Sequence, residues 1–422
     1  MVYTRDKELM KVVHISCFDW MGGAGKAANR LHNELKSQGV DSHMLVDVKE
    51  CLDDDSIHSI TGLTGWWSRL YYHIRGQIDQ LPLSKYKRNI DPWVVGRIKR
   101  NLKRRLKKLN PDIVHIHWTS ATASLKELSS LPYPTVWTMH DNNLATGGCC
   151  YSHDCIRYKD ECGMCPQLNS SNPNDLSNLM HKKKQEYFHN SDITFVVLSE
   201  WQKNIATSSL ILRDSKIVKI ANGVDTHLFS PKDMIESRKS LSLPLDRKLI
   251  AFGAEAISNP LKGGVVLNDA LSLLDQQMPA DDKPIVVTFG RIDENRIFKS
   301  GLKTINLGYL DVERLAMLYS AVDVTVVPSL EDNCPQVPLE AQACGCPVVG
   351  FAGTGVAELV DDGHTGFIVE YNSKDELCHG IISALKTGQL HREYIREYIE
   401  SNYDIKLVAK KYLELYMRIV KT

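Results

Sequence analysis

The chain has 422 residues, of which 43% are hydrophobic and 24% are charged. That composition is typical of a globular protein, and the length predicts two domains of about 200 residues each rather than one core. Lys and Arg together number 51, as do Asp and Glu, so no global charge draws the chain to nucleic acid or to a membrane; either role would need a local patch.

Short apolar runs alternate with helical stretches along the whole chain. They fall at residues 12–16, 43–46, 113–118, 135–139 and 193–198, and again at 249–253, 285–289, 305–307, 324–327 and 348–351. Most are continuously apolar, which is typical of parallel strands buried on both faces. Their alternation with helices predicts an α/β fold of two doubly wound units, with a boundary in the turn-rich segment 222–231.

A glycine-rich loop, Gly22-Gly23-Ala24-Gly25, lies between the first strand and the helix that follows it. Glycines there let the backbone approach a phosphate or a sugar closely. A tight strand-to-helix turn explains the same residues equally well, so the loop alone does not decide the function.

A basic segment lies between Arg97 and Lys108 (RIKRNLKRRLKK), where eight of twelve residues are Lys or Arg. Ile98, Leu102 and Leu106 recur at helical spacing, so we expect an amphipathic helix. Its charged face is either solvated or attracted to anionic lipid, at about 1 kcal/mol per basic residue near the surface. We expect no nucleic-acid binding, because no aromatic or base-reading motif accompanies the patch.

His140 directly follows the strand at residues 135–139, at the edge where open parallel sheets bind ligands. A histidine at a strand end is also a common structural hydrogen-bonder. His115 and His117 alternate across the preceding strand, and we assign structural roles to both.

A cysteine-rich segment (GGCCYSHDCIRYKDECGMCPQL) follows His140. Cys149, Cys155, Cys162 and Cys165 have the spacing C-x5-C-x6-C-x2-C, whose last pair is a usual half of a tetrahedral zinc site. Cys150 would be spare, and His153 is an alternative ligand. No signal-peptide or bilayer-spanning pattern is present, which predicts a cytoplasmic protein whose thiols stay reduced. Structural zinc, free thiols and disulfides remain the alternatives.

The segment 324–351 (VTVVPSLEDNCPQVPLEAQACGCPVVGF) contains a strand, a polar loop, a helix and a second strand. The helix starts near Pro335 and closes at Gly345. Glu340 lies in its second turn, where a carboxylate can accept two hydrogen bonds from a ribose diol. Asp332, in the loop before the helix, can face a sugar. A solvated helix residue and a helix-start acid are the alternative readings of these two carboxylates.

This segment resembles the signature of the family 4 glycosyltransferases, retaining enzymes of GT-B architecture. In that signature two acidic residues separated by seven others precede an Ala-rich helix, Gly and Pro-Val. Glu340 matches the second acidic position, and Asp332 matches the first, which is usually Glu. The resemblance implies that Glu340 binds the ribose hydroxyls of a nucleotide-sugar and that Asp332 contacts the donor sugar.

Further matches follow in the family's order. Asn222-Gly223-Val224-Asp225 resembles its interdomain element, and Lys262-Gly263 resembles the pair whose lysine neutralises the donor diphosphate. Gly353-Thr354-Gly355 resembles part of the loop that closes the nucleotide pocket. The chain departs from the pattern at Gly253-Ala254, where the family has an arginine shortly after the glycine.

The resemblance implies roles for the glycine loop and for His140 as well. The loop would lie against the donor phosphate, and His140 would position the donor sugar and stabilise the transition state without acting as a general base. The catalytic residues would be His140, Lys262 and Asp332. The expected donor-binding residues are Gly22, Gly23, Lys262, Gly308, Asp332, Asn333, Glu340, Thr354 and Gly355.

The same resemblance sets the expected domains and the role of the cysteines. It implies a GT-B fold of two Rossmann-like domains facing across a cleft: residues 1–225 for the acceptor, with the cysteine-rich insertion at 147–168, and 226–400 for the donor. A last helix at 401–422 would pack back on the first domain. The insertion resembles one in polysaccharide-biosynthesis members such as colanic-acid-type transferases, many of which have His in place of Cys150.

We therefore expect transfer of a hexose from a nucleoside-diphosphate sugar to a hydroxyl of a lipid-linked glycan in bacterial surface polysaccharide biosynthesis. The resemblance implies that configuration at the anomeric carbon is retained. Because no covalent nucleophile stands out, a front-face displacement fits better, and positioning with electrostatic stabilisation removes the need for a catalytic metal. Peripheral membrane contact would run through the basic segment. A nucleotide-sugar epimerase of the same fold and a non-catalytic, zinc-bearing interaction protein remain the alternatives.

Overall fold

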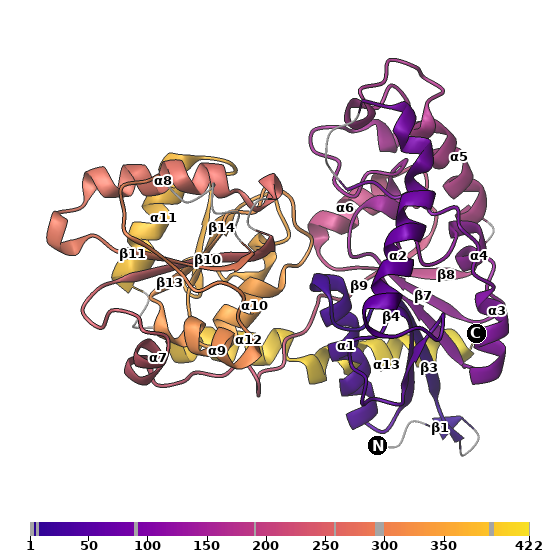
Figure 1. The fold of residues 1–422 in the computed structure, drawn as a ribbon, viewed down its shortest axis with the longest axis horizontal. Helices are drawn as coiled ribbons and strands as arrows, with labels where there is room; N and C mark the ends of the chain where they lie inside the picture. Colours follow the sequence, from indigo (N-terminus) through magenta and orange to yellow (C-terminus); the bar gives the residue numbers. More distant parts are fainter. Residues whose placement is uncertain are drawn as a thin grey trace. The chain divides into compact units, whose positions relative to one another are not determined.

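A computed structural model describes residues 4–5, 8–87, 92–189, 191–256, 259–291, 299–387 and 392–421. The chain divides into two compact units. Unit 1 comprises Met1–Ala221 and Val408–Thr422, and unit 2 comprises Asn222–Leu407 (Figure 1). Among the described residues, no helix combines the length and the apolar composition that crossing a bilayer requires.

Unit 1 is built on a parallel sheet of seven strands in the order β5-β4-β3-β6-β7-β8-β9. The strands are β3 (Lys11–Phe18), β4 (Asp41–Val48), β5 (Ile57–Ser59), β6 (Ile113–Ile116), β7 (Thr135–Thr138), β8 (Ile193–Val197) and β9 (Lys216–Lys219), and a small hairpin pairs β1 (Thr4–Arg5) with β2 (Glu8–Leu9). The helices are α1 (Gly22–Ser37), α2 (Gly65–Gln80), α3 (Leu102–Leu109), α4 (Leu125–Ser129), α5 (Leu176–His189), α6 (Glu200–Ser208) and most of α13 (Ile405–Lys421). The order reverses between β3 and β6. Open parallel sheets bind ligands in the crevice beyond the carboxyl ends of the strands at such a reversal.

Unit 2 is built on a second parallel sheet, in the order β12-β11-β10-β13-β14-β15. Its strands are β10 (Leu249–Ala256), β11 (Ile285–Arg291), β12 (Thr304–Asn306), β13 (Val324–Val327), β14 (Val348–Phe351) and β15 (Gly366–Val369). Its helices are α7 (Met234–Ser240), α8 (Gly264–Gln277), α9 (Val312–Ala321), α10 (Gln336–Ala343), α11 (Lys374–Thr387) and α12 (Arg392–Tyr403). Here the order reverses between β10 and β13, so the loops after these two strands lie where open parallel sheets bind ligands.

The core of each unit explains the continuous apolar runs. β6, β7 and β8 are buried along their whole length, as are β13 and β14. In unit 2, α8 and α11 cover one face of the sheet, while α9, α10 and α12 lie on the other (Figure 1). Burial on both faces is what a doubly wound sheet requires, and this part of the prediction is confirmed.

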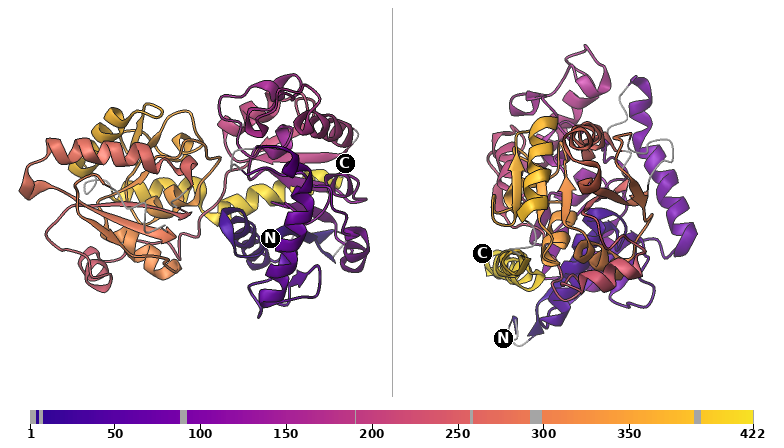
Figure 2. Two further views of the ribbon diagram at one scale, coloured as in Figure 1. Left: turned by 45° about the horizontal axis from the view of Figure 1, so that its top comes forward. Right: turned by 90° about the vertical axis from the view of Figure 1, so that its left-hand side faces the viewer.

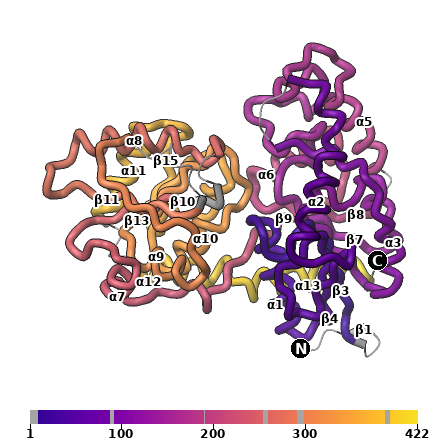
Figure 3. The backbone as a smooth tube through the Cα atoms, in the orientation of Figure 1, coloured from indigo at the N-terminus to yellow at the C-terminus, as the bar shows by residue number. Residues whose placement is uncertain are grey.

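The C-terminal helix α13 packs on the central strands of unit 1 (Figures 2 and 3). The Tyr416 hydroxyl lies 2.6 Å from His115 Nδ1, and the Tyr412 hydroxyl lies 3.0 Å from Thr138 Oγ1. The last expected helix, at residues 401–422, is in fact two pieces, because α12 ends at Tyr403 and α13 begins at Ile405.

The expected amphipathic helix between Arg97 and Lys108 is wrong for its first five residues, because α3 begins only at Leu102. Distant carboxylates bind the backbone of this stretch: Asp79 accepts from the backbone N–H groups of Gly96 and Arg97, at 2.9 and 2.8 Å. Glu127 accepts from those of Arg100 and Leu102, at 2.7 and 2.6 Å. These contacts hold residues 96–102 in an irregular conformation.

Candidate functional site

The two loops at the strand-order reversal of unit 2 bring together a lysine and a carboxylate. Lys262 ends a single 3-10 turn (Pro260–Lys262) after β10, and Asp332 follows β13. Lys262 Nζ lies 2.5 Å from Asp332 Oδ2, and the backbone N–H of Leu330 donates to the carbonyl of Leu261 at 2.8 Å. Both charged side chains are partly exposed, so the pair lies at the surface of unit 2.

The lysine loop can approach β13 closely because Gly263 follows Lys262. Gly263 has φ 70°, and a Cβ at this position would lie 1.8 Å from the carbonyl oxygen of Pro328. Only glycine fits this position, for both backbone and steric reasons. The fold therefore requires glycine at position 263, whereas the packing does not require lysine at position 262.

The loop after β13 is joined to the loop after β14. The backbone N–H of Gly355 donates to the carbonyl of Asp332 at 2.8 Å, and a Cβ on Gly355 would lie 1.8 Å from the carbonyl oxygen of Asn333. Asn333 is 3% exposed, and neither its amide nitrogen nor its amide oxygen has a hydrogen-bond partner among the described residues. A buried amide whose nitrogen and oxygen are both unpaired is costly, and Asn142 of unit 1 is in the same situation among the described residues. The Thr354 hydroxyl instead donates to the carbonyl of Phe351.

Glu340 lies in α10, as the sequence predicts, and is 6% exposed. Its negative charge contributes to raising the pKa of the neighbouring Cys344 thiol, although burial is the larger cause. α10 begins after Pro335 with no side-chain cap and no acidic residue in its first turn, and the same holds for α8 after Gly263. In the same unit α9 is capped by Asp311. Uncapped N-termini present backbone N–H groups and partial positive charge.

Gly308 lies at the carboxyl edge of the same sheet, but two strands away from β10. It has φ 65°, its N–H donates to Asn306 Oδ1 at 2.9 Å, and its carbonyl accepts from the N–H of Gly290 at 2.8 Å. These contacts join the ends of β11 and β12. They do not bring Gly308 into contact with Lys262 or Asp332.

In unit 1, the glycine loop lies after β3 at the reversal of strand order. Gly22 has φ 68° and starts α1, whose N-terminus has no side-chain cap and no acidic residue. A Cβ on Gly25 would contact the Phe18 carbonyl at 3.2 Å, so packing explains that glycine. A Cβ on Gly23 would meet nothing within 4 Å. Packing therefore does not require glycine at position 23.

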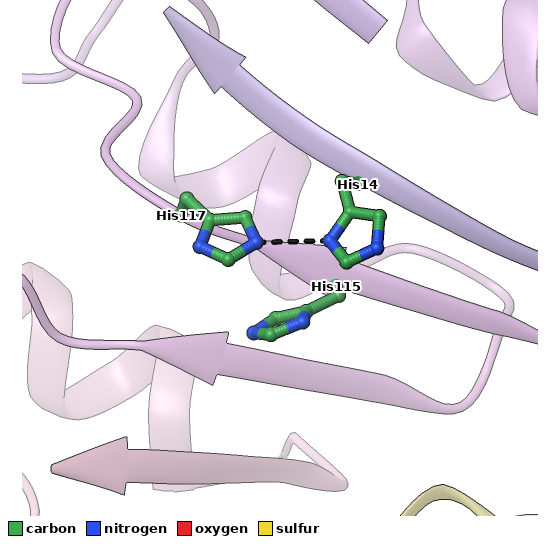
Figure 4. Close-up of side chains that lie close together, drawn as sticks. All are labelled: His14, His115 and His117. Atoms are coloured by element: carbon green, nitrogen blue, oxygen red, sulfur yellow. Dashed lines mark hydrogen bonds between the residues drawn. The ribbon is translucent and has the colours of Figure 1, made fainter. Parts of the chain in front are cut away.

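A column of hydrogen-bonded histidines runs from the interior of unit 1 to the end of β7. His14 Nδ1 lies 3.0 Å from His117 Nε2 (Figure 4), and His117 Nδ1 lies 3.1 Å from His140 Nε2. His115, opposite His14 in register, bonds Tyr416 and Thr138 instead, at 2.6 and 2.7 Å. His115 therefore has the structural role that the sequence predicts, whereas His117 contacts His140 directly. His14 was not singled out from the sequence. The signal that could have found it is a histidine within each of two apolar runs that are expected to pair as neighbouring strands.

All four histidines are neutral near pH 7. Burial lowers the pKa of His140 to about 4 and lowers the pKa of His14, His115 and His117 well below the usual range. A neutral imidazole has one donor and one acceptor nitrogen, so the bonds along the column couple the tautomers of its members. Because Nε2 of His140 is engaged by His117, its Nδ1 is the nitrogen left for a ligand.

His140 lines a small pocket at the carboxyl ends of β6 and β7. The Trp118 indole N–H donates to Asp141 Oδ2 at 3.0 Å, and burial raises the pKa of the Asp141 carboxyl. Thr119 and Ser120 also line the pocket. Imidazole, indole, carboxyl and hydroxyl groups thus share one small hollow with the apolar side chains of Ala123, Leu125 and Met139.

The four cysteines of the predicted zinc set line one pocket beside the end of β7; they are Cys149, Cys155, Cys162 and Cys165. None forms a disulfide in the described structure. Burial raises the pKa of Cys149 and of Cys162 to about 12. Within the described residues, the only trio of possible metal ligands whose donor atoms all lie within 4.8 Å of one another is His14, His115 and His117. The four cysteines share a pocket, but no three of their sulfur atoms lie that close together. His153 is exposed and does not line the cysteine pocket.

A buried lysine that no sequence motif singles out supports this region. Lys184 is fully buried and donates to the carbonyls of Asn143 and Thr146, at 2.6 and 3.0 Å. Burial lowers its pKa to about 8. These bonds tie α5 to the loop that leads from His140 to Cys149.

Comparison with known proteins covers both units. Residues 21–228 match the family described as Glycosyltransferase Family 4, and residues 233–401 match Glycosyl transferases group 1. A D-inositol 3-phosphate glycosyltransferase of Thermomonospora curvata is 34% identical over 193 residues, which are 41% of this chain and 44% of that protein. The matched stretch is thus less than half the length of either protein.

Solved structures resemble the whole chain. Sucrose-phosphate synthase from Thermosynechococcus elongatus has a TM-score of 0.68 and 18% identity, covering 97% of this chain and 99% of that one. Anabaena Alr3699/HepE, solved with UDP and glucose, has a TM-score of 0.65 and 16% identity, covering 97% and 100%. At such low identity these likenesses establish the fold. With the two family matches spanning most of its length, the chain belongs to the family 4 glycosyltransferases and has their GT-B architecture of two Rossmann-like units.

Proposed function

We propose that the chain is a retaining glycosyltransferase that moves a hexose from a nucleoside-diphosphate sugar to a hydroxyl of a lipid-linked glycan in bacterial surface polysaccharide biosynthesis. The observation that carries the proposal is the grouping of Lys262, Asp332 and Asn333 at the strand-order reversal of unit 2, beside the helix that carries Glu340. Parallel sheets bind ligands at this place, and the charges suit a nucleotide-sugar.

The nucleotide end rests on Glu340. A buried carboxylate on a helix with an uncapped N-terminus can accept hydrogen bonds from both ribose hydroxyls while the helix start faces the phosphates. Lys262 would supply the positive charge for the diphosphate, with the N-terminus of α8 next to it. The loop containing Thr354 and Gly355 would close the site.

The chemistry follows from positioning and electrostatics. The bond from the anomeric carbon to the phosphate oxygen breaks, the bond to the acceptor oxygen forms on the same face, and the acceptor proton passes to the leaving phosphate. Lys262 and the helix N-termini would stabilise the growing phosphate charge. A neutral His140 would bond the sugar through Nδ1, and Asp332 with Asn333 would hold its hydroxyls. No step needs a metal or a covalent intermediate.

A screen of nucleotides tests the donor site. UDP, GDP and ADP, and the sugars of each, are added to the wild-type chain and to the Lys262→Ala and Glu340→Gln variants, and the melting temperature is measured. One nucleotide series should stabilise the wild type, since a ligand at 100 times its Kd adds about 2.7 kcal/mol. Both variants should lose most of that gain, while Glu376→Gln, an exposed position on α11, should keep it. Stabilisation by none of the nucleotides would overturn the donor site.

Product analysis separates transfer from epimerisation. An epimerase would convert the donor sugar without an acceptor, whereas a transferase needs one to form a new glycosidic bond. Two acceptor classes are worth testing, a lipid-linked glycan and a free inositol phosphate. The second is included because of the relative named D-inositol 3-phosphate glycosyltransferase.

We also propose that Cys149, Cys155, Cys162 and Cys165 hold a structural zinc ion. They share one pocket, and four thiolates are a usual set for a closed zinc site. Elemental analysis of the purified chain should find about one zinc per chain, reduced in Cys162→Ser and unchanged in Cys51→Ser, which lies outside the cluster. A metal-free chain that melts at the same temperature with and without added zinc would overturn this assignment.

Peripheral contact with anionic lipid through the basic segment is part of the proposal. Lys103, Arg104, Arg105, Lys107 and Lys108 are exposed, and none forms an ion pair with another described residue. Each would add about 1 kcal/mol of attraction near an anionic surface. A lipid-linked acceptor is presented at such a surface.

A further inference from the structure

Helix α2 has its apolar side turned away from unit 1. The two residues of α2 that are buried are polar, Ser68 and Asp79. Along the outer side, large apolar side chains recur at steps of three and four residues, and each is between 37% and 60% exposed. They are Leu63, Trp66, Trp67, Leu70, Tyr71, Ile74, Ile78 and Leu81, including the residues that flank the helix. We call these eight side chains the α2 stripe.

The α2 stripe reverses the ordinary pattern of a surface helix, which buries its apolar side and exposes its polar side. The reversal is fixed by specific contacts, because the Asp79 carboxylate accepts from the backbone N–H groups of Gly96 and Arg97. On the same inner side, the Tyr72 hydroxyl donates to the carbonyl of Ser120 at 3.0 Å. α2 lies on the outside of unit 1 in both orientations of the ribbon (Figures 1 and 2). A continuous exposed stripe of this kind marks a binding surface.

The composition of the α2 stripe fits a lipid interface. Trp66 and Trp67 stack with ring centroids 3.8 Å apart, and tryptophan and tyrosine are the residues that concentrate where bilayers meet water. The stripe joins the basic segment directly. The Arg100 guanidinium, which is buried in an ion pair with Asp47, lies 5.2 Å from the centre of the Tyr71 ring, and Arg97 donates to the carbonyl of Ile78 at 2.8 Å.

We propose that the α2 stripe lies in the plane of an anionic bilayer, with its aromatic and aliphatic side chains below the headgroups and the exposed basic residues of α3 over them. These basic residues are Lys103, Arg104, Arg105, Lys107 and Lys108. Apolar side chains complement the acyl region of such a bilayer, and basic side chains next to them complement its anionic headgroups. A purely apolar protein partner would not use the basic side chains. Docking does not depend on the transferase assignment. If that assignment holds, α2 would keep the enzyme where a lipid-linked acceptor is presented.

Sedimentation with vesicles tests this surface on the full chain. Vesicles of phosphatidylcholine alone and with about one third phosphatidylglycerol are compared for the wild type and for Trp66→Ser/Trp67→Ser. The wild type should bind the anionic vesicles, and the double variant should bind them at least about tenfold more weakly. Ile235→Ser/Leu245→Ser, an exposed apolar pair in unit 2, should bind like the wild type. Lys103→Gln/Lys107→Gln should weaken binding only to the anionic vesicles.

Three results would overturn the proposal. The wild type could bind neither vesicle, the tryptophan variant could bind as well as the wild type, or the variant could change a dimer into a monomer in solution. The last result would make a second copy of the chain the occupant of the stripe. Because both tryptophans are exposed, the variant should melt like the wild type and keep its nucleotide-induced stabilisation. That stabilisation distinguishes a failure of docking from a failure of the donor site.

Discussion

Lys262 and Asp332 form an ion pair of 2.5 Å across the strand-order reversal of unit 2. Lys262, which is expected to bind the diphosphate, is thus paired with Asp332, which is expected to bind the sugar. A bound diphosphate would compete with Asp332 for the ammonium group, so binding of the donor would free the carboxylate for the sugar hydroxyls. This relationship couples the two halves of the proposed donor site.

Removing the carboxylate should therefore separate binding from transfer. In Asp332→Asn, Lys262 keeps its charge without its competitor, so a nucleoside diphosphate should bind as tightly as in the wild type or more tightly. Transfer should fall by about 10- to 1000-fold, as for the loss of a transition-state contact. Calorimetric titration and initial rates measure the two quantities. Equal losses in affinity and rate would contradict the coupling.

Glu340 should distinguish ribose from deoxyribose. Hydrogen bonds to a charged group contribute about 1.5 to 3 kcal/mol, so Glu340→Gln should bind the nucleotide about 10- to 100-fold more weakly. The wild type should lose a similar factor when the 2′-hydroxyl is removed from the nucleotide. The variant should show little further loss with the deoxynucleotide. If it still discriminates like the wild type, another residue binds the ribose.

The buried histidines should make the fold sensitive to acid. His14, His115, His117 and His140 are neutral in the folded chain but take up protons near pH 6.5 when unfolded, because burial lowers their pKa only in the folded state. Below about pH 6.5, and above the lowered pKa values of the folded chain, the unfolded chain binds more protons than the folded chain. The free energy of unfolding therefore falls as pH falls below about 6.5. Each histidine contributes up to about 1.4 kcal/mol per pH unit. Urea titrations at pH 7.5, 6 and 5 measure the slope, which His115→Gln should reduce.

The pH profile of transfer should reflect the histidine column. With a His140 pKa of about 4, the rate should be level from pH 6 to 8 and fall only towards pH 4. His117→Asn removes the hydrogen bond that holds His140 Nε2. The variant should therefore have a lower kcat and a nearly unchanged KM. A variant with an unchanged rate and profile would show that His117 does not position His140.

Two glycines should respond oppositely to alanine. Gly355→Ala should destabilise unit 2 by more than about 2 kcal/mol, because its Cβ would collide with the Asn333 carbonyl. Gly23→Ala meets no atom within 4 Å and should leave the melting temperature unchanged or slightly raised. The same variant should slow transfer if the loop lies against the donor phosphate. A Gly23→Ala enzyme with full activity would assign that glycine to the turn alone.

The sequence was sufficient for the parts of the fold that depend on local pattern. Continuous apolar runs located the central strands of both sheets. The helix start signal at Pro335 and the stop signal at Gly345 placed Glu340 in α10. The edge strand β9, Lys216–Lys219, was missed, because its two lysines are exposed and the strand lacks an apolar run. Periodicity shows which residues of α2 share a side, but not that the apolar side points outward.

Other features depend on contacts between distant residues. Helix α3 starts late because the Asp79 and Glu127 side chains bind the preceding backbone, from 17 to 27 positions away. His115 and Tyr416 are 301 positions apart, and nothing local to either indicates the pair. That the Asn333 side-chain amide has no hydrogen-bond partner among the described residues also becomes visible only when its neighbours are placed.

The return of α13 to unit 1 means that the chain passes between the units twice, near residues 221–222 and again near 407–408. A single proteolytic cut at either passage would therefore leave the fragments held together by the packing of α13. Residues 222–407 form unit 2 as one uninterrupted stretch, whereas a fragment ending at 221 would lack the tyrosines that bond His115 and Thr138. Adding residues 408–422 as a separate peptide should restore the folding of that fragment. The protein could then be reassembled from pieces divided where the chain passes between the units.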